Sequence, residues 1–410
     1  MAIPKFKPIP TGLLLFALAF HPASSHGENA DRSLYQFVSV LVANHPDVKA
    51  SYESLRAAEA STTAAGRPMY NPELSLEAEN SEERTTTIGL RQTLDWTRKN
   101  KSKGLIASAE QEIAKAKYKL VRWEAMTNLL GYLAAFQLGS QRELLARERA
   151  SLMDDFSEIA KKRLNAGDLT SVEMNLVSLA VAEARMQKAS ALANLSEARQ
   201  QVLSFMPVSS DGWPELAKSF PAPPGDIVGD KVSELPEIIV ARSEVHRAEE
   251  EVRLRKKERK ADPTFALAGG KEGDKDLVAL SFSMPLHIRN NFSAEVAAAL
   301  ARSEQARQRQ DGVTRHTTTR VRSARVRYQI SYDAWREWEG VGLASLNEQR
   351  AELNRLWESG EMSTTDYLVQ LRQTLDVQET ALELKLELWD SWFEWLRASG
   401  LIETWLQGET

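Results

Sequence analysis

Two segments of the chain alternate apolar and polar residues with the period of a β-strand. Residues 74–79 read Leu-Ser-Leu-Glu-Ala-Glu, and residues 87–94 resume the alternation after a polar tip. The second segment repeats the pattern at residues 265–267 and 278–284, around a charged tip. Period two is typical of strands with one apolar and one polar face. The pattern therefore predicts β-hairpins at residues 72–95 and 263–287.

Long proline-free stretches cover residues 73–206 and, after the second hairpin, 286–410. Their helical periodicity predicts very long helices, the first of which spans about 100 Å at about 1.5 Å per residue. Such rods must pack as a coiled coil or a helical tube. The expected helices are 34–67 and 237–260 before the hairpins, 98–164 and 292–357 after them, and the return helices 170–205 and 363–398.

The two halves of the chain resemble each other. Four motifs recur in order at offsets of 190 to 193: His45-Pro46 with Leu235-Pro236, Asn71-Pro72 with Asp262-Pro263, Gln92-Thr93-Leu94 with Met284-Pro285-Leu286, and Gly167-Asp168-Leu169-Thr170 with Gly360-Glu361-Met362-Ser363. Self-similarity at a fixed period indicates a repeat architecture. We expect a first repeat at residues 26–206, a proline-rich connector at 207–235 and a second repeat at 236–410.

Each long helix is expected to end at a tip far from the strands. Gly167 and Gly360 suit a helix C-cap, because glycine adopts the left-handed conformation without a Cβ clash. Thr170 and Ser363 suit the N-cap of the returning helix. The two equivalent, exposed helical turns, which include Asp168 and Glu361, are candidates for docking to another protein.

Charge and composition exclude several classes of function. The balance of 52 basic and 57 acidic residues argues against a nucleic-acid partner, which would need a basic face. The absence of cysteine excludes thiol nucleophiles, cysteine-based zinc sites and disulfides. The six histidines show no metal-ligand spacing, and Gly340-Val341-Gly342 lacks the third glycine of a dinucleotide loop. We expect no enzyme activity, no cofactor and no metal site.

The first 25 residues resemble an export signal. Lys5 and Lys7 precede an apolar run at residues 11–20, and Ala23-Ser24-Ser25 offers small residues for cleavage. The apolar run is too short to cross a bilayer as a helix, and no other run of 18 apolar residues exists. The sequence therefore predicts an exported protein without a transmembrane helix, which could enter a membrane only through its strands.

Two further clusters each have two interpretations. Trp389, Trp392, Phe393 and Trp395 could form a ligand cage, but their helical spacing favours packing within the helical tube. Leucines alternate as in a strand at residues 382–388, although the Glu and Lys between them favour helix. Basic residues cluster where strands become helices, and they could meet anionic lipid headgroups or be solvated helix ends. These residues are Arg98, Lys99, Lys101, Lys103, Arg253, Arg255, Lys256, Lys257, Arg259 and Lys260.

Four strands of this length cannot close a barrel, and hydrocarbon does not tolerate an open sheet edge. Several chains must therefore share one barrel. With duplicated halves, one hairpin and one long helix per half, and two Gly-[Asp/Glu]-[Leu/Met]-[Thr/Ser] tips, the chain resembles the outer membrane factor family, the TolC-like channels of tripartite efflux systems. Asn71-Pro72-Glu73-Leu74 and Gln92-Thr93-Leu94-Asp95 are most similar to its heavy-metal cation efflux (CzcC-like) subgroup, which usually follows with a Gly-Gly-Lys-Arg-like stretch where this chain has Trp96-Thr97-Arg98-Lys99.

The resemblance implies a mainly α protein: a homotrimer with a long-helix tube in the periplasm and a shared twelve-stranded barrel in outer membrane lipid. It also implies a periplasmic adaptor and an inner-membrane resistance-nodulation-division type pump as partners. The alternation then places Leu76, Leu90, Leu280 and Phe282 toward lipid. It places Glu77, Glu79, Arg91 and Ser281 toward the lumen.

The resemblance further implies an entrance at the periplasmic end, where the family carries acids. Glu173 and Asp366 occupy such positions, just past the two tips. Acids are also favoured in any first helical turn, so an ordinary helix start is the alternative. The chain departs from the family at Met362, where a basic residue is usual, and at Val369, where a second acid is usual.

A different class of function also fits an exported, helical, cysteine-free chain. A periplasmic adaptor or a coiled-coil structural protein would share these properties. It should show one helical hairpin flanked by extensive β segments, whereas here two β-hairpins alternate with two helical hairpins. The alternation favours the passive export channel, and the sequence does not identify the substrate.

Overall fold

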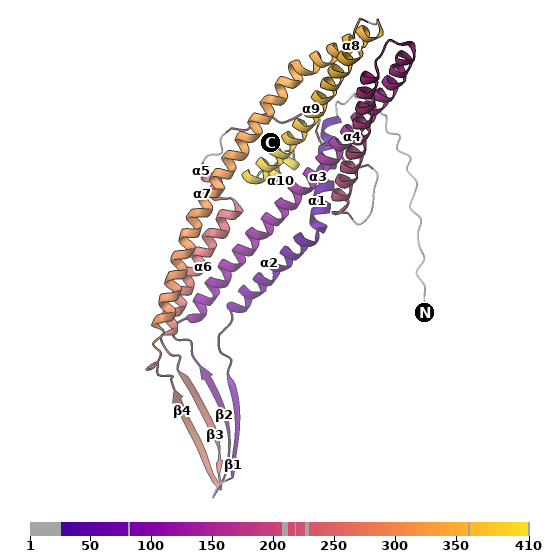
Figure 1. The fold of residues 1–410 in the computed structure, drawn as a ribbon. Coiled ribbons are helices and arrows are strands. Elements are labelled where there is room, and N and C mark those ends of the chain that lie inside the picture. Colours follow the sequence, from indigo (N-terminus) through magenta and orange to yellow (C-terminus); the bar gives the residue numbers. More distant parts are fainter. Residues whose placement is uncertain are drawn as a thin grey trace, which may run out of the picture.

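The computed structural model describes residues 26–80, 83–206, 212–217, 219–225, 229–359 and 361–408. The molecule is long and narrow, with four strands at one end and two helical turns at the other (Figure 1). The expected export signal at residues 1–25, part of the connector at 207–235 and Gly360 lie outside the described residues.

The elements follow the repeat order expected from the sequence. They are α1 (His26–Asn44), α2 (Pro46–Ala65), β1 (Glu73–Asn80), β2 (Arg84–Thr93), α3 (Lys99–Ala166), α4 (Ser171–Leu203), α5 (Gly229–Ser233), α6 (Pro236–Glu258), β3 (Thr264–Glu272), β4 (Lys275–Ser283), α7 (Ser293–Glu337), the π-helical turn η1 (Trp338–Gly342), α8 (Leu343–Glu358), α9 (Thr364–Ser399) and α10 (Ile402–Leu406).

The single helix expected at residues 34–67 is wrong, because the structure divides it into α1 and α2 at His45. Pro46 lacks an N–H group, and its ring disfavours helical backbone at the preceding residue. His45 accordingly has a ψ of 135° and caps α2 through its ring Nδ1, which accepts from the N–H of Asp47.

The second long helix also differs from the expected unbroken span of 292–357. It contains a π-helical turn at Trp338–Gly342 between α7 and α8. The ring of Trp338 lies against Gly342, where a Cβ atom would come within 2.3 Å of the ring atom Cε3. Gly342 thus makes room for the tryptophan, and the first long helix, α3, has no comparable interruption.

The start of each long helix has the same unusual geometry. Arg98 and Phe292, at φ angles of 57° and 58°, are the two non-glycine residues with positive φ within the described part of the chain. Asp95 accepts hydrogen bonds from the N–H groups of Lys99 and Asn100, at 2.8 and 2.7 Å. Asn290 accepts from the N–H of Phe292 at 2.9 Å. The duplication therefore extends to the turn that redirects the chain from strand to helix.

The four strands form one antiparallel sheet in the order β1-β2-β3-β4. The two strands of each hairpin pair with each other. In addition, β2 of the first repeat pairs with β3 of the second from Thr85↔Glu272 to Thr93↔Thr264. This central seam joins the two halves of the chain.

The main core lies midway along the molecule, where α3, α7 and α9 pass one another (Figure 1). The tryptophan cluster of α9 is buried in it: Trp392 stacks on Trp395 with 5.0 Å between ring centroids, and Tyr328 of α7 packs on Trp392 at 4.8 Å. Residues 382–388 belong to α9, which resolves the strand-like leucine alternation in favour of helix. The aromatic residues therefore serve as packing.

A buried polar cluster fastens the sheet to the helices. The Nζ of Lys99 lies 2.8 Å from Oδ2 of Asp262 and donates to the carbonyl of Lys260, also at 2.8 Å. The Tyr70 hydroxyl donates to the same Asp262 oxygen at 2.7 Å. Lys99 and Asp262 are only 7% and 8% exposed. The cluster links three chain segments at the level where strands give way to helices.

This arrangement corrects part of the hypothesis that the ten clustered basic residues meet anionic lipid headgroups. Lys99 is buried, and Lys257 donates to the Arg98 carbonyl and the Ser102 hydroxyl. Arg253 and Arg255 pair with glutamates of their own helix. At least four of the ten basic side chains are thus held within the chain, leaving fewer charges for lipid headgroups.

The buried pair generates a stability prediction. Lys99→Met leaves the Asp262 carboxylate buried without its cation, and we expect a loss of about 3–5 kcal/mol in the free energy of unfolding. Lys101→Met, two residues away on the exposed side of α3, is the matched control. Lys99→Met/Asp262→Leu should recover most of the loss, because the unpaired charge is removed. Chemical denaturation measures all three, and equal midpoints for the two single variants would contradict the role assigned to Lys99.

Candidate functional site

The strand residues expected to face a lumen share one side of the sheet. The register places Glu73, Arg91, Ala266 and Ser281 in one row across the four strands. Directly opposed residues point to the same face, and Glu77 and Glu79 follow Glu73 by the period of two. Arg91 lies 3.9 Å from Glu73. This face is polar and carries Glu77, Glu79, Arg91 and Ser281 together.

The opposite face is apolar and exposed. Leu76 pairs with Ile88, and Leu90, Leu267 and Leu280 form a row across β2, β3 and β4. Leu76 and Leu280 are 75% and 78% exposed. Contiguous apolar surface of this kind marks contact with lipid or another protein. The other large apolar side chains exposed on this face are Leu74, Phe265, Val278 and Phe282.

The outer strands leave the sheet open. Within the described residues, the outer sides of β1 and β4 have no strand partner, so each presents a row of free backbone N–H and C=O groups. Among these residues no helix is both long and apolar enough to cross a membrane.

The helical layers are open at the same two sides. Next to the sheet the helices lie in the order α2, α3, α6, α7, and beyond the central core in the order α4, α3, α9, α8 (Figure 1). One lateral side of the molecule is therefore formed by β1, α2 and α4, and the other by β4, α7 and α8. Each chain is an open sector along its whole length.

The first tip has the geometry expected from its sequence. Gly167 adopts a φ of 83° at the C-cap of α3, and the N–H of Asp168 bonds to the carbonyl of Arg163. Thr170 and Glu173 form a capping box at the start of α4. Hydrogen bonds from the Thr170 backbone N–H and then from its hydroxyl hold the pKa of the Glu173 carboxyl below its ordinary value. Glu173 is therefore ionised at neutral pH and acts as a helix cap.

The second tip matches the first where it is described. Ser363 caps α9, its Oγ accepting from the N–H of Asp366 and donating to the Asp366 carboxylate at 2.6 Å. The N–H of Glu361 bonds to the Leu356 carbonyl. Both candidate entrance acids, Glu173 and Asp366, thus take part in local capping.

The two tips lie side by side at the end remote from the strands (Figure 1). An aromatic cluster packs them together: Phe156 of α3 lies 5.1 Å from Trp357 and 5.5 Å from Tyr367 between ring centroids, and Arg163 stacks over Trp357 at 4.1 Å. This second core makes the two turns one exposed surface.

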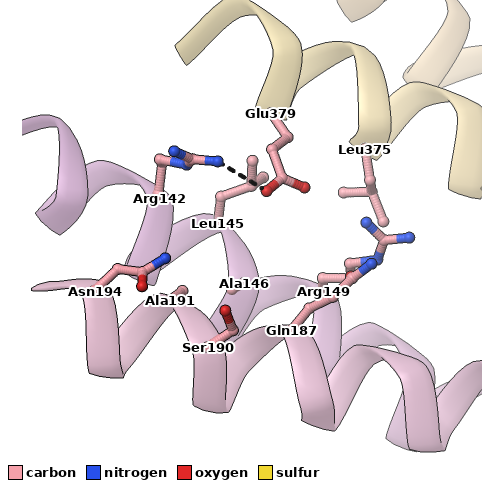
Figure 2. Close-up of a pocket in the computed structure, with 10 residues that line it drawn as sticks. All are labelled: Arg142, Leu145, Ala146, Arg149, Gln187, Ser190, Ala191, Asn194, Leu375 and Glu379. Atoms are coloured by element: carbon pink, nitrogen blue, oxygen red, sulfur yellow. Dashed lines mark hydrogen bonds and ion pairs between the residues drawn. The ribbon is translucent and has the colours of Figure 1, made fainter. Parts of the chain in front are cut away.

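A small polar cavity of about 120 Å³ lies between α3, α4 and α9, with Arg142 and Arg149 on its wall (Figure 2). Arg142 bonds to Glu379 and Glu383 at 3.2 and 2.7 Å, and buried Arg149 bonds to Asp376 at 2.9 Å. These ion pairs, between two arginines of α3 and three acids of α9, form a charge link between the two helices beside the cavity.

Sequence reasoning missed this link and the Lys99–Asp262–Tyr70 cluster. Arginines seven residues apart on α3 and acids three to four residues apart on α9 are the signal for the first. No spacing rule announces the second, whose members are brought together from three separate segments.

Comparison with known proteins finds a family similarity over part of the chain. The family model described as "Outer membrane efflux protein" matches residues 37–206. The cobalt-zinc-cadmium resistance protein CzcC of Cupriavidus metallidurans is 21% identical over 277 residues, which cover 66% of each chain, just under two thirds of that relative's length.

Solved structures share the fold over nearly the whole chain. The CmeC outer membrane channel of Campylobacter jejuni has a TM-score of 0.76 at 14% identity, covering 99% of this chain and 97% of its own. The outer membrane protein VceC of Vibrio cholerae has a TM-score of 0.75 at 15% identity, covering 89% and 96%. The helices and strands of this chain are arranged as in these two outer membrane proteins. This chain therefore has the fold of outer membrane channels, and its residues 37–206 match the outer membrane efflux protein family.

Proposed function

We propose that three copies of this chain form a passive duct that carries heavy-metal cations from the periplasm to the exterior. In the proposed assembly, a periplasmic adaptor docks on the helical tips and an inner-membrane pump of the resistance-nodulation-division type supplies the cargo. The duct itself performs no chemistry, since the energy comes from the pump.

The open sector is the observation that carries the proposal. The sheet has an exposed apolar face and two unpaired edges, and hydrocarbon does not tolerate unpaired backbone groups. Identical sectors joined side to side close into a ring when the rotation between them completes a circle. Three sheets of four strands make a twelve-stranded barrel with the polar face inside, and the helical layers close at the same sides.

The cargo assignment rests on similarity and on charge. CzcC is by its name a cobalt, zinc and cadmium resistance protein, and the Asn71-Pro72-Glu73-Leu74 stretch is similar to that subgroup. Glu77 and Glu79 on the polar strand face, with Asp366 and Glu173 at the other end, would favour cations along the path.

Fractionation of cells that produce the whole protein tests this function. The duct should appear in the outer membrane fraction as an oligomer. Its band on a denaturing gel should shift to the position of the monomer only after the sample is boiled. A soluble monomer would exclude the duct and favour a periplasmic adaptor or structural protein.

The two sheet faces predict opposite responses to charge. Leu280→Arg puts a cation on the apolar face, where it costs about 2–4 kcal/mol at the bilayer midplane, so we expect the yield of outer membrane oligomer to fall. Ser281→Arg, one residue away on the polar face, should assemble and lower single-channel conductance. Gel migration and planar-bilayer recording measure the two effects. Equal assembly defects in both variants would contradict the assigned faces.

The first tip predicts a docking defect without an assembly defect. Gly167→Val forces a β-branched residue into left-handed backbone, a cost of about 1–2 kcal/mol or more, and should reshape the turn. Gly167→Asn is the control, because asparagine tolerates this conformation. We expect the valine variant to form normal outer membrane oligomers but to lose metal resistance, and the asparagine variant to keep it. The equivalent Gly360→Val should behave as Gly167→Val; retained resistance in both valine variants would exclude the tips as the docking surface.

The entrance predicts a change in ion selectivity. Asp366→Asn removes one negative charge per copy while the amide oxygen can still accept from the Ser363 hydroxyl, so the α9 cap should persist. We expect lower cation selectivity and weaker block by divalent ions in planar bilayers, with unchanged oligomer stability. Glu173→Gln serves as the comparison at the other capping acid. Unaltered selectivity and block in Asp366→Asn would leave the residue a helix cap alone.

A further inference from the structure

The two hairpins are copies of each other at the level of single residue pairs. Shifting β1 by 191 residues and β2 by 192 converts Leu74↔Leu90 into Phe265↔Phe282, and both pairs occur in the sheet. Leu76↔Ile88 likewise becomes Leu267↔Leu280. The offsets found between sequence motifs are thus also the offsets between the two hairpin registers.

The chain contains one complete example of how a second hairpin attaches to a first. In that central seam Arg91 lies opposite Ala266 and Leu90 opposite Leu267. Where the strands give way to helices, the N–H of Leu94 donates to the carbonyl of Pro263 at 2.9 Å, and the indole N–H of Trp96 donates to the carbonyl of Ala261 at 2.8 Å. Both contacts link the end of the first hairpin to the short segment, residues 261–263, that precedes the second hairpin.

The outer side of the second hairpin carries the equivalent backbone N–H at Leu286, although Ile288 replaces Trp96 and has no indole donor. Leu286 and Ile288 are the counterparts of Leu94 and Trp96, and they are 71% and 82% exposed. The counterpart of the Asp262-Pro263 connector is Asn71-Pro72, at the opposite side of the molecule beside β1. One side of the chain therefore carries half of a seam, and the other side carries the complementary half.

We infer that β4 of one copy pairs with β1 of the next in the register of the central seam, an inference that rests on the proposed function. Applying the two offsets to the observed β2–β3 pairs gives Ser283 opposite Ser75, Phe282 opposite Leu76, Ser281 opposite Glu77 and Leu280 opposite Ala78, the second member of each pair belonging to the next copy. The N–H of Leu286 then donates to the carbonyl of Pro72 in that copy.

The inferred register satisfies the faces of the sheet. Phe282 and Leu280 meet Leu76 and Ala78 on the apolar side, while Ser283 and Ser281 meet Ser75 and Glu77 on the polar side. A slip by one residue would turn every apolar side chain of one strand to the polar face. The acidic β1 edge also meets only uncharged β4 residues, so no like charges oppose each other.

The correspondence ends toward the strand tips. Gly270 approaches β2 so closely that a Cβ atom would lie 2.0 Å from the Thr86 carbonyl oxygen. Its counterpart in β1 is Glu79, whose side chain prevents such an approach. The seam between copies is therefore inferred only from Ser283↔Ser75 to Leu280↔Ala78. It also lacks the buried Lys99–Asp262 pair, because Asn71 stands in place of Asp262.

Disulfide trapping in the full chain tests the register, and the chain has no native cysteine to interfere. The variants S75C/S283C and L76C/F282C place cysteines directly opposite, and adjacent antiparallel pairs alternate between wide and close spacing, so one of the two is the close type. Cross-linking of S75C/S281C would indicate a register shifted by two residues. S75C/A279C is the negative control, because its second cysteine lies four residues from the inferred partner of residue 75. Diagonal Cβ atoms about 7–8 Å apart lie outside disulfide reach.

After oxidation of outer membrane fractions, we expect at least one directly opposed variant to give on the order of tenfold more covalent oligomer than either offset variant. The denatured ladder should stop at three chains, because a closed ring has no free side. Efficient cross-linking of S75C/S281C, or none in any variant while the fraction still holds native oligomers, would overturn the register and leave the duct standing. Monomers in the unoxidised fraction would overturn both the register and the duct.

Discussion

Backbone hydrogen bonding in the absence of water is the constraint on which this structure depends. A sheet that stands in hydrocarbon must pair every N–H and C=O group, and a chain with four strands leaves two rows unpaired. In the proposed barrel, the exposed leucines of one face meet lipid and the polar face meets water in the interior. The sheet of one chain is therefore open at both lateral sides, and the proposed function requires these sides to be paired.

The duplication places two equivalent hairpins side by side in one sheet. Each repeat supplies one hairpin and one helical hairpin, and the central seam shows how two repeats join. In the inferred assembly the seam between copies follows the same plan, so that a ring of identical chains would be a ring of nearly identical repeats. The buried Lys99–Asp262 pair distinguishes the two kinds of seam. The seam inside the chain is stabilised by this buried ion pair, whereas the inferred seam between copies has Asn71 at the position equivalent to Asp262.

The two repeats are not equal in their helices. The first long helix runs without interruption, whereas the second contains a π-helical turn that Gly342 permits and Trp338 fills. The arginine and acid ladders between α3 and α9 hold the helices of the two repeats together at intermediate height. Closer to the tips, the aromatic cluster of Phe156, Trp357 and Tyr367 packs the two tips together. Glu173 and Asp366 both cap the helix that returns from a tip, which by itself accounts for an acid at each of these positions.

Local patterns in the sequence were sufficient for the strands, the long helices and the tips, because period two, helical periodicity and glycine C-caps are properties of neighbouring residues. The duplication was also legible, since its motifs recur in order. The division at His45 could have been read from Pro46, but a long apolar periodicity on both sides concealed it. Tertiary structure alone decided the pairing of β2 with β3, the burial of Lys99 against Asp262, and the charge links between α3 and α9. These contacts join residues separated by about 160 to 240 positions, and no local pattern encodes which of many possible partners will meet once the helices pack.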